Sequence, residues 1–124
     1  MTVLVDSDIL IEISRQRDQD ILKKWTALAL SDNEILCSPV SAAELWAGAL
    51  PREHEATAKL FHTLLCVLID YETGRQAGDY LRQYGKSHGL QIGDALIAAA
   101  AVMNRAELWT RNRKHYPMKE LSFY

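Results

Sequence analysis

The hydrophobic positions of this chain fall into two kinds of segment. Short, nearly continuous apolar runs predict buried strands, and longer segments with apolar residues three or four positions apart predict amphipathic helices. The runs predict strands at 3–5, 34–37, 67–69 and 107–110, and a last edge strand at 121–123. The longer segments predict helices from residue 9, over 19–30, from residue 42, and over 52–65, 72–86 and 95–103.

Strands that alternate with helices along a chain predict one parallel sheet with helices on both faces. The chain has 124 residues, enough to bury a single core. We therefore expect one domain over 1–124, with a three-layer α/β/α fold and a short sheet of four or five strands. The segment 95–103 is apolar almost all round, which predicts a buried helix. It is far shorter than the roughly 18–20 residues that cross a bilayer, so no membrane association is expected.

Polar side chains stand where the predicted strands end and the next helices begin. Asp6 follows the first strand, and Glu44 lies early in the helix after the second. Asp94 opens the buried helix, and Asn112 follows the fourth strand. Right-handed crossovers bring the carboxyl ends of parallel strands to one edge of the sheet. We therefore expect these four side chains to converge on one cleft.

Each of these residues also has a purely structural interpretation. Asp6 suits a helix N-cap, and Ser41 with Glu44 suits a capping box. Asp94 suits the positive end of a helix dipole, and Asn112 suits a turn. Clustered carboxylates, however, repel one another unless a cation lies among them. A set of oxygen ligands without Cys or His favours Mg²⁺ or Mn²⁺ over zinc.

A basic segment adjoins the expected cleft. The net charge of the chain is -2, yet residues 105–119 hold five Lys or Arg side chains against one acid, Glu107. A local basic patch can contact a polyanion even when the whole chain is slightly acidic. We expect Arg111, Arg113 and Lys114 to contact a nucleic-acid backbone.

The two cysteines, Cys37 and Cys66, both lie in apolar runs. This pattern favours free thiols that pack as small hydrophobic side chains, which fits a reducing cytoplasm.

Four segments of the chain carry a family resemblance. They are VLVDSDILI at 3–11, VSAAEL at 40–45, IGDALIAAAA at 92–101 and LWTRN at 108–112. In their order and spacing the chain resembles the PIN-domain ribonucleases, and most closely the small VapC-type toxins of toxin–antitoxin pairs. The resemblance covers essentially the whole chain and implies a PIN-like fold over 1–124.

The resemblance also implies a function. It implies Mg²⁺- or Mn²⁺-dependent endonucleolytic cleavage of RNA, a cognate antitoxin protein that covers the acidic cleft, and a cytoplasmic homodimer. It assigns the metal site to Asp6, Glu44 and Asp94, and it adds Asn112 to the catalytic set. Many members carry a fourth acid where this chain has Asn112, so the number of metal ions stays open.

Other residues near these segments receive lesser roles from the resemblance. It implies that Ser7 and Thr110 are supporting hydroxyls. Asp8 falls where the family often has Asn or Ser, so it is expected to be peripheral. Glu12, one helical turn further on, is expected at most at the rim of the cleft.

Two other classes of protein remain open at this point. A phosphoacceptor receiver domain is similar in size and would use 67–70 as its phosphorylated strand. However, it would place the acceptor Asp70 late in the chain, without a strand-end lysine after it. A non-catalytic PIN-like module that only binds RNA or protein is the second alternative.

Overall fold

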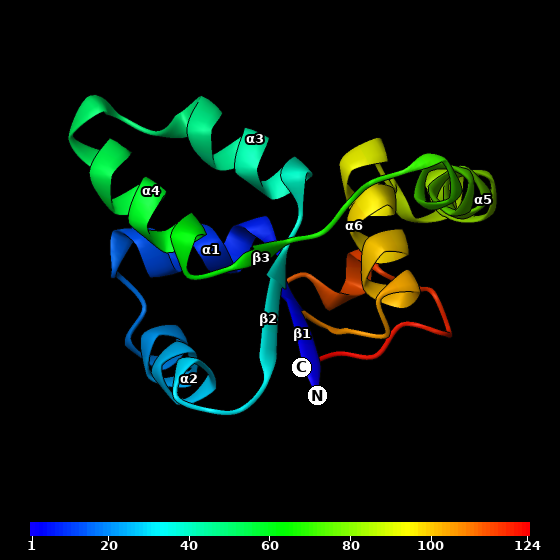
Figure 1. The fold of residues 1–124 in the computed structure, drawn as a ribbon. Helices are drawn as coiled ribbons and strands as arrows, with labels where there is room; N and C mark the ends of the chain where they lie inside the picture. The colour runs from blue at the N-terminus through cyan, green and yellow to red at the C-terminus, as the bar shows by residue number, and fades with distance from the viewer.

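A single parallel sheet lies at the centre of the computed structural model, which describes residues 1–124. The strands are β1 (Thr2–Val5), β2 (Glu34–Cys37), β3 (Leu65–Cys66) and β4 (Glu107–Trp109). Their spatial order is β3-β2-β1-β4, and every pairing is parallel. Because β1 is an interior strand, the residue that follows it lies in the middle of one sheet edge (Figure 1).

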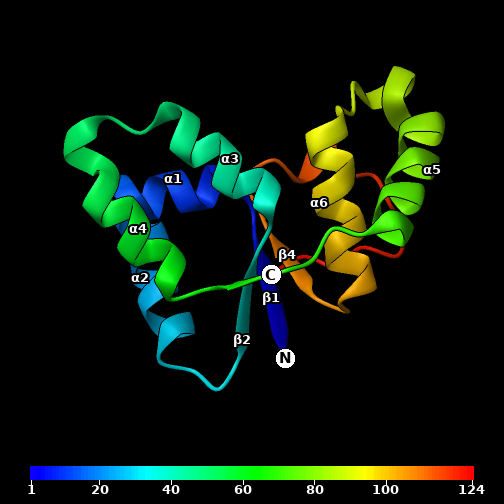
Figure 2. The same cartoon turned by 45° about the horizontal axis from the view of Figure 1, so that its top comes forward.

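Six α-helices cover the two faces of the sheet. They are α1 (Ser7–Arg15), α2 (Gln19–Ala29), α3 (Pro39–Gly48), α4 (His54–His62), α5 (Tyr71–His88) and α6 (Ile92–Met103). Two short 3₁₀ helices, η1 (Pro51–Glu53) and η2 (Arg113–His115), lie in connections. Helices α1–α4 lie on one side of the sheet, and α5 and α6 lie on the other (Figures 1 and 2). The expected three-layer α/β/α fold is confirmed.

The alternation of side chains along each strand divides the interior into two cores. Leu4, Leu36 and Leu108 point to the side of α5 and α6. The intervening strand positions join the core formed with α1–α4, to which they contribute Val3, Val5, Cys37 and Trp109. Alanines at 95 and 98–101 are completely buried in α6, so their small side chains let this helix lie close to its neighbours.

The third strand differs from its expected position. It comprises Leu65–Cys66 rather than 67–69, and the helix expected to continue to residue 65 ends at His62. The apolar run misleads because β3 is an edge strand: Leu65 is 58% exposed and Leu68 87% exposed. The expected last strand at 121–123 is also reduced, to one parallel bridge between Phe123 and Leu108.

Helix α3 begins one turn earlier than the capping-box pattern indicates. Its N-cap is Ser38, whose Oγ accepts a hydrogen bond from the backbone N–H of Val40, and Pro39 occupies the first helical position. Ser41 therefore lies inside the helix and is fully buried. Because residues three positions apart share a helix face, Ser41 and Glu44 point the same way.

The structure also tests the predicted burial of the two cysteines. Cys37 is buried as expected, but Cys66 is exposed on the edge strand, so the interpretation of Cys66 as a packed side chain is wrong. None of the helices combines the length and the apolar character that a bilayer span requires.

Candidate metal and nuclease site

The carboxylate of Asp6 lies at the carboxyl end of β1, where it is only 6% exposed. Asp6 is the N-cap of α1, and its Oδ1 accepts a hydrogen bond from the backbone N–H of Ser7 at 2.7 Å. Its Oδ2 accepts hydrogen bonds from the hydroxyl of Thr110 at 2.9 Å and from that of Tyr116 at 2.8 Å. Three donors from separate segments therefore hold this side chain in one orientation.

A cleft of about 210 Å³ opens beside Asp6. Asp94, in the first turn of α6, and Asn112, after β4, line the same cleft. Three of the four side chains predicted to converge therefore do so. The cleft is completed by residues that the sequence did not point to, namely Gly89, Gln91, His115 and Tyr116.

The electrostatics of the cleft disfavour an uncompensated carboxylate at Asp6. Burial raises the pKa of Asp6 above its ordinary value, and the negative charge of Asp94 raises it further. Hydrogen bonds from Tyr116, Thr110 and the Ser7 backbone partly oppose this rise. Burial and the charge of Asp6 raise the pKa of Tyr116, so its hydroxyl stays protonated and acts as a donor.

Glu44 lies outside this cleft, on the other side of Ser7. Its Oε1 is 2.9 Å from the hydroxyl of Ser7, which is also 2.8 Å from the hydroxyl of Ser41. A hydroxyl has one proton, so Ser7 donates to Glu44 only if Ser41 donates to Ser7. Ser7 thus connects the two acids, with its backbone N–H on Asp6 and its side chain on Glu44.

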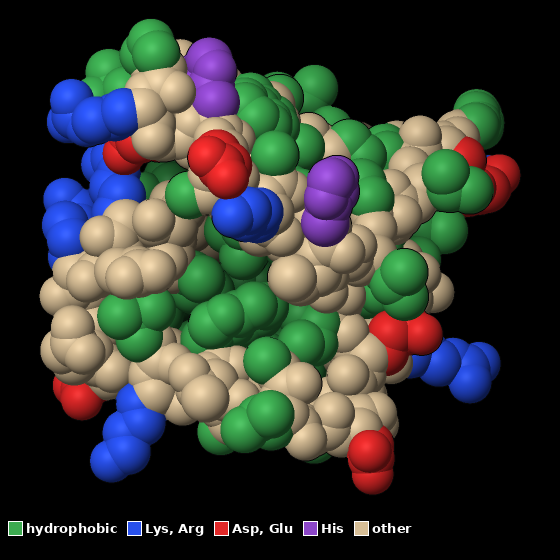
Figure 3. All heavy atoms as spheres, turned by 60° about the vertical axis from the view of Figure 1, so that its left-hand side comes forward, with side chains coloured by type: hydrophobic (Ala, Val, Ile, Leu, Met, Phe, Trp, Pro, Cys, Tyr) green, Lys and Arg blue, Asp and Glu red, His purple; other side chains and the backbone are tan.

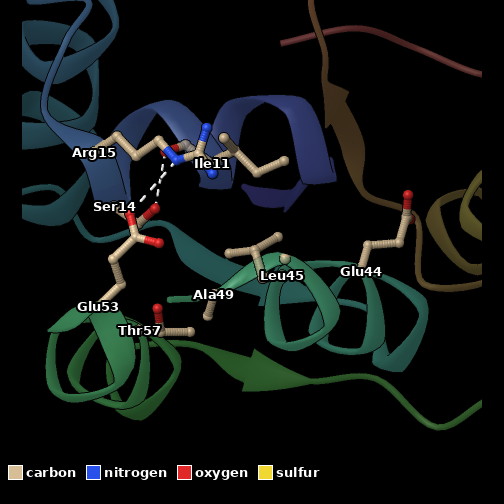
Figure 4. A pocket seen from close by; sticks show the side chains of 9 residues that line it. Ile11, Ser14, Arg15, Glu44, Leu45, Ala49, Glu53 and Thr57 are labelled. Carbon is tan, nitrogen blue, oxygen red and sulfur yellow. Dashed lines mark hydrogen bonds and ion pairs between the residues drawn. The ribbon is translucent and has the colours of Figure 1, made fainter. Parts of the chain in front are cut away.

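A separate narrow hollow between α1, α3 and α4 has Glu44 at one end (Figure 4). At its other end, Arg15 Nε lies 3.7 Å from Glu53 Oε2. Glu44 points away from that ion pair and toward the hydroxyl of Ser7.

The donor set suits a hydrated hard cation rather than a closed metal cage. No three His, Cys, Asp or Glu side chains lie close enough together to form a coordination shell by themselves. Mg²⁺ is ordinarily held by only one or two carboxylates and keeps several water ligands. Asp6 and Asp94, which face one cleft, meet this requirement with oxygen atoms alone.

Asp8 does not line the cleft, but it has a structural role beside it. Its Oδ2 accepts a hydrogen bond from the backbone N–H of Arg111 at 2.9 Å, and Asn112 Nδ2 lies 3.4 Å away. Its Oδ1 is buried and has no hydrogen-bond partner. Burial raises the pKa of Asp8, and the charge of Asp6 raises it further. Asp8 therefore holds the loop after β4 against α1.

The three basic residues predicted to contact a nucleic-acid backbone lie in different surroundings. The guanidinium of Arg111 lies 3.3 Å from Glu12 and 3.3 Å from Asp18. Glu12 is only 8% exposed and also pairs with Arg17 at 2.7 Å, so it is not a rim residue. Arg111 is thus tied to acids of α1 and of the α1–α2 connection.

The other two basic residues are less restrained. Arg113 lies over the ring of Phe123 and donates to the backbone carbonyl of Tyr124 at 3.2 Å, whereas Lys114 is exposed and has no ion-pair partner. Both line a hollow of about 350 Å³ formed by residues 110–115. This hollow shares Asn112 and His115 with the acidic cleft, so the two adjoin.

Comparison with known proteins places the chain in a family. Residues 3–121 match the model of the PIN domain. The ribonuclease VapC10 of Mycobacterium tuberculosis is 35% identical over 119 residues, which cover 95% of this chain and 88% of that protein.

Solved structures agree with this fold. VapBC2 of Rickettsia felis, solved with a promoter DNA fragment, matches with a TM-score of 0.82 at 20% identity, over 100% of this chain and 98% of the other. A toxin–antitoxin complex from Klebsiella pneumoniae matches with a TM-score of 0.76 at 21% identity, over 96% of this chain and 94% of the other.

The raised pKa of Asp8 predicts how stability depends on pH without metal. A carboxyl whose pKa is higher in the folded state binds its proton more tightly there, so the free energy of unfolding falls as pH rises above about 3.8. We expect Asp8→Asn to be more stable than the unsubstituted chain at pH 7 in EDTA and to lose less stability between pH 4 and pH 7.

Thermal unfolding across this pH range measures both effects. Asp32→Asn, an exposed turn position, is the matched control and should follow the unsubstituted chain. If Asp8→Asn loses as much stability between pH 4 and pH 7 as the unsubstituted chain, the pKa of Asp8 is not raised in the folded state.

Proposed function

Since the chain belongs to the PIN-domain family, and within it to the VapC ribonucleases, we propose that it is a metal-dependent endoribonuclease that acts as the toxin of a toxin–antitoxin pair. The observation that carries the proposal is the shared cleft of Asp6 and Asp94 beside a basic hollow. An acidic cleft binds a cation, and a neighbouring basic surface binds the backbone of a nucleic acid.

The chain's own residues have distinct tasks in this proposal. Asp6 and Asp94 hold Mg²⁺ or Mn²⁺, and Glu44 adds negative charge from the far side of Ser7. When bound, the ion supplies Lewis-acid activation of water and charge neutralisation at the scissile phosphate. Thr110 and the backbone N–H of Ser7 keep the Asp6 carboxylate in place. The amide of Asn112 faces the same cleft, where it can donate to a phosphate oxygen.

The surroundings of Asp70 disfavour a receiver domain. Asp70 is the N-cap of α5, and its Oδ1 accepts from both the backbone N–H and the hydroxyl of Thr73. It follows the edge strand β3 and lies outside the cleft of Asp6 and Asp94. Its side chain therefore has a complete structural role as a helix cap.

A substitution at Asp94 separates the nuclease from a non-catalytic module. We expect Asp94→Asn to lower the rate of RNA cleavage in Mg²⁺ or Mn²⁺ roughly 100- to 1,000-fold, the range for removal of one preorganised electrostatic group. Asp20→Asn is a matched control, because Asp20 also lies in the first turn of a helix but does not line the cleft. EDTA should abolish cleavage by both the unsubstituted chain and the control.

Cleavage is measured on a labelled single-stranded RNA, with circular dichroism to confirm that each variant is folded. An unsubstituted chain that binds RNA but does not cleave it in either metal would favour the non-catalytic module. An Asp94→Asn protein with full activity would remove Asp94 from the site.

The basic residues predicted to contact RNA differ in how free their side chains are to bind a phosphate. Lys114 is free to meet a phosphate, whereas the guanidinium of Arg111 is already paired with two acids. We expect Lys114→Gln to weaken RNA binding and to lower the slope of log affinity against log salt concentration by about 0.7, the value for one phosphate contact on a single strand.

Fluorescence anisotropy with Asp94→Asn as the background measures binding without cleavage. Lys119→Gln, an exposed lysine outside the hollow, should leave the salt slope unchanged. Equal slopes for the two lysine variants would show that Lys114 does not contact the RNA backbone.

We propose that the antitoxin partner, which is expected to cover the acidic cleft, also covers an apolar hollow on the face formed by α1, α2 and α4 (Figure 3). The hollow measures about 230 Å³, and its apolar lining is Ile13, Trp25, Ala56 and Leu60. A contiguous apolar surface rimmed by polar residues is typical of a protein interface. The Klebsiella pneumoniae toxin–antitoxin complex, which shares this fold, supports a protein partner, and the apolar lining supports this surface for it.

A charge placed in this hollow tests the antitoxin surface. We expect Ala56→Arg to weaken binding of the cognate antitoxin by about tenfold or more, roughly 1.4 kcal/mol, while RNA cleavage is unchanged. Ala27→Arg, on an exposed position of α2, is the control. Relief of growth arrest on co-expression and calorimetry with the purified pair give the readouts. Unaltered affinity in Ala56→Arg would place the partner elsewhere.

The homodimer also stays a proposal. Its support is the outer edge of β3, which no further strand of the sheet covers: Leu65 is exposed on this strand, and Leu68 is exposed just beyond it. An exposed apolar edge strand is a surface that a second copy can cover.

A further inference from the structure

Tyr116 is a buried residue of the loop after η2, 110 positions from Asp6 in the sequence. Only 3% of its surface is exposed, and its hydroxyl donates to Asp6 Oδ2 at 2.8 Å. Its ring joins the core beneath α6 while its hydroxyl reaches the cleft. Tyr116 therefore joins the packing of the core to the orientation of the central carboxylate.

The hydrogen bonds of Asp6 are distributed unequally between its two oxygen atoms. Each carboxylate oxygen has about two lone-pair positions. Oδ2 accepts from both Thr110 and Tyr116, so its positions are occupied. Oδ1 accepts only from the backbone N–H of Ser7, so one of its positions is free.

We propose that Tyr116 is a positioning residue that holds the Asp6 carboxylate so that Oδ1 faces the cation in the cleft. This inference rests on the proposed metal-dependent function and adds a residue to it. The hydroxyl of Tyr116 occupies the last acceptor position of Oδ2 and removes the freedom of Asp6 to turn about its Cβ–Cγ bond. Groups that orient a metal ligand in this way typically change metal affinity about 10- to 100-fold when removed.

The chain contains a matched control for this hydrogen bond. Tyr80 is 2% exposed, and its hydroxyl donates to a carboxylate oxygen of Glu120 at 2.5 Å. Tyr80→Phe and Tyr116→Phe each remove one hydrogen bond from a buried phenol to a carboxylate and keep the ring. Only Tyr116→Phe removes it from a carboxylate in the cleft.

The experiment measures Mn²⁺ binding to the full chain and its variants by electron paramagnetic resonance of the free ion. We expect Tyr116→Phe to bind Mn²⁺ at least about tenfold more weakly, and Tyr80→Phe to bind it as the unsubstituted chain does. Cleavage by Tyr116→Phe should need more Mn²⁺ for half of its maximal rate, while saturating Mn²⁺ restores most of kcat.

A second variant keeps the proposal testable if Tyr116→Phe does not fold. Thr110→Val removes the other donor to Oδ2, so it should weaken Mn²⁺ binding in the same direction. Mn²⁺ affinities of Tyr116→Phe and Thr110→Val within twofold of the unsubstituted chain would overturn the proposal, as would an equal loss in Tyr80→Phe. Mn²⁺ binding without RNA cleavage by the unsubstituted chain would instead overturn the proposed function. The Mn²⁺ affinities of the variants would still test whether Tyr116 positions Asp6.

Discussion

The buried carboxylate of Asp6 is the constraint from which the arrangement of the site follows. A carboxylate removed from water is costly unless several donors face it, and no single element of this fold supplies them. The start of α1 gives one donor, the end of β4 gives a second and the loop after η2 gives a third. The backbone continues the same connection, because the N–H of Asp6 donates to the carbonyl of Trp109. The β1–β4 pairing and the loop that follows it are thus bound to one side chain.

The distribution of charge around Asp6 fits the proposed cation site in the cleft. The guanidinium of Arg111 pairs with Glu12 and Asp18 rather than with the acids of the cleft. Its backbone N–H, not its side chain, meets Asp8. Arg111 therefore stabilises Glu12 and Asp18 and does not compensate the negative charge of the carboxylates that line the cleft. An arginine turned into the cleft would neutralise Asp6 permanently and compete with a divalent ion for the same oxygen atoms.

The sequence predicted those parts of the site that depend on topology. Asp6 and Asp94 stand at a strand end and a helix start, and a parallel sheet brings such positions to one edge whatever the loops between them do. The surroundings of Glu44 depended on a local detail, the first residue of α3, because a shift of one turn exchanges the roles of Ser38 and Ser41. Tyr116 had no signal of this kind, since it lies in an irregular loop without periodicity. The predicted bounds of β3 were wrong, because an exposed edge strand carries apolar residues that hydrophobic periodicity assigns to the interior.

Ser7 makes the positions of two acids depend on each other. Its backbone N–H fixes Asp6, and its hydroxyl lies between Ser41 and Glu44. Both contacts arise at the first residue of α1, so a rotation of that helix end would move the two carboxylates together. The buried pair of hydroxyls also links α3 to the start of α1, because Ser41 is fully buried and cannot exchange Ser7 for water. The geometry of the site is therefore set where β1 turns into α1, and α3, β4 and the loop after η2 each bring their groups to that junction.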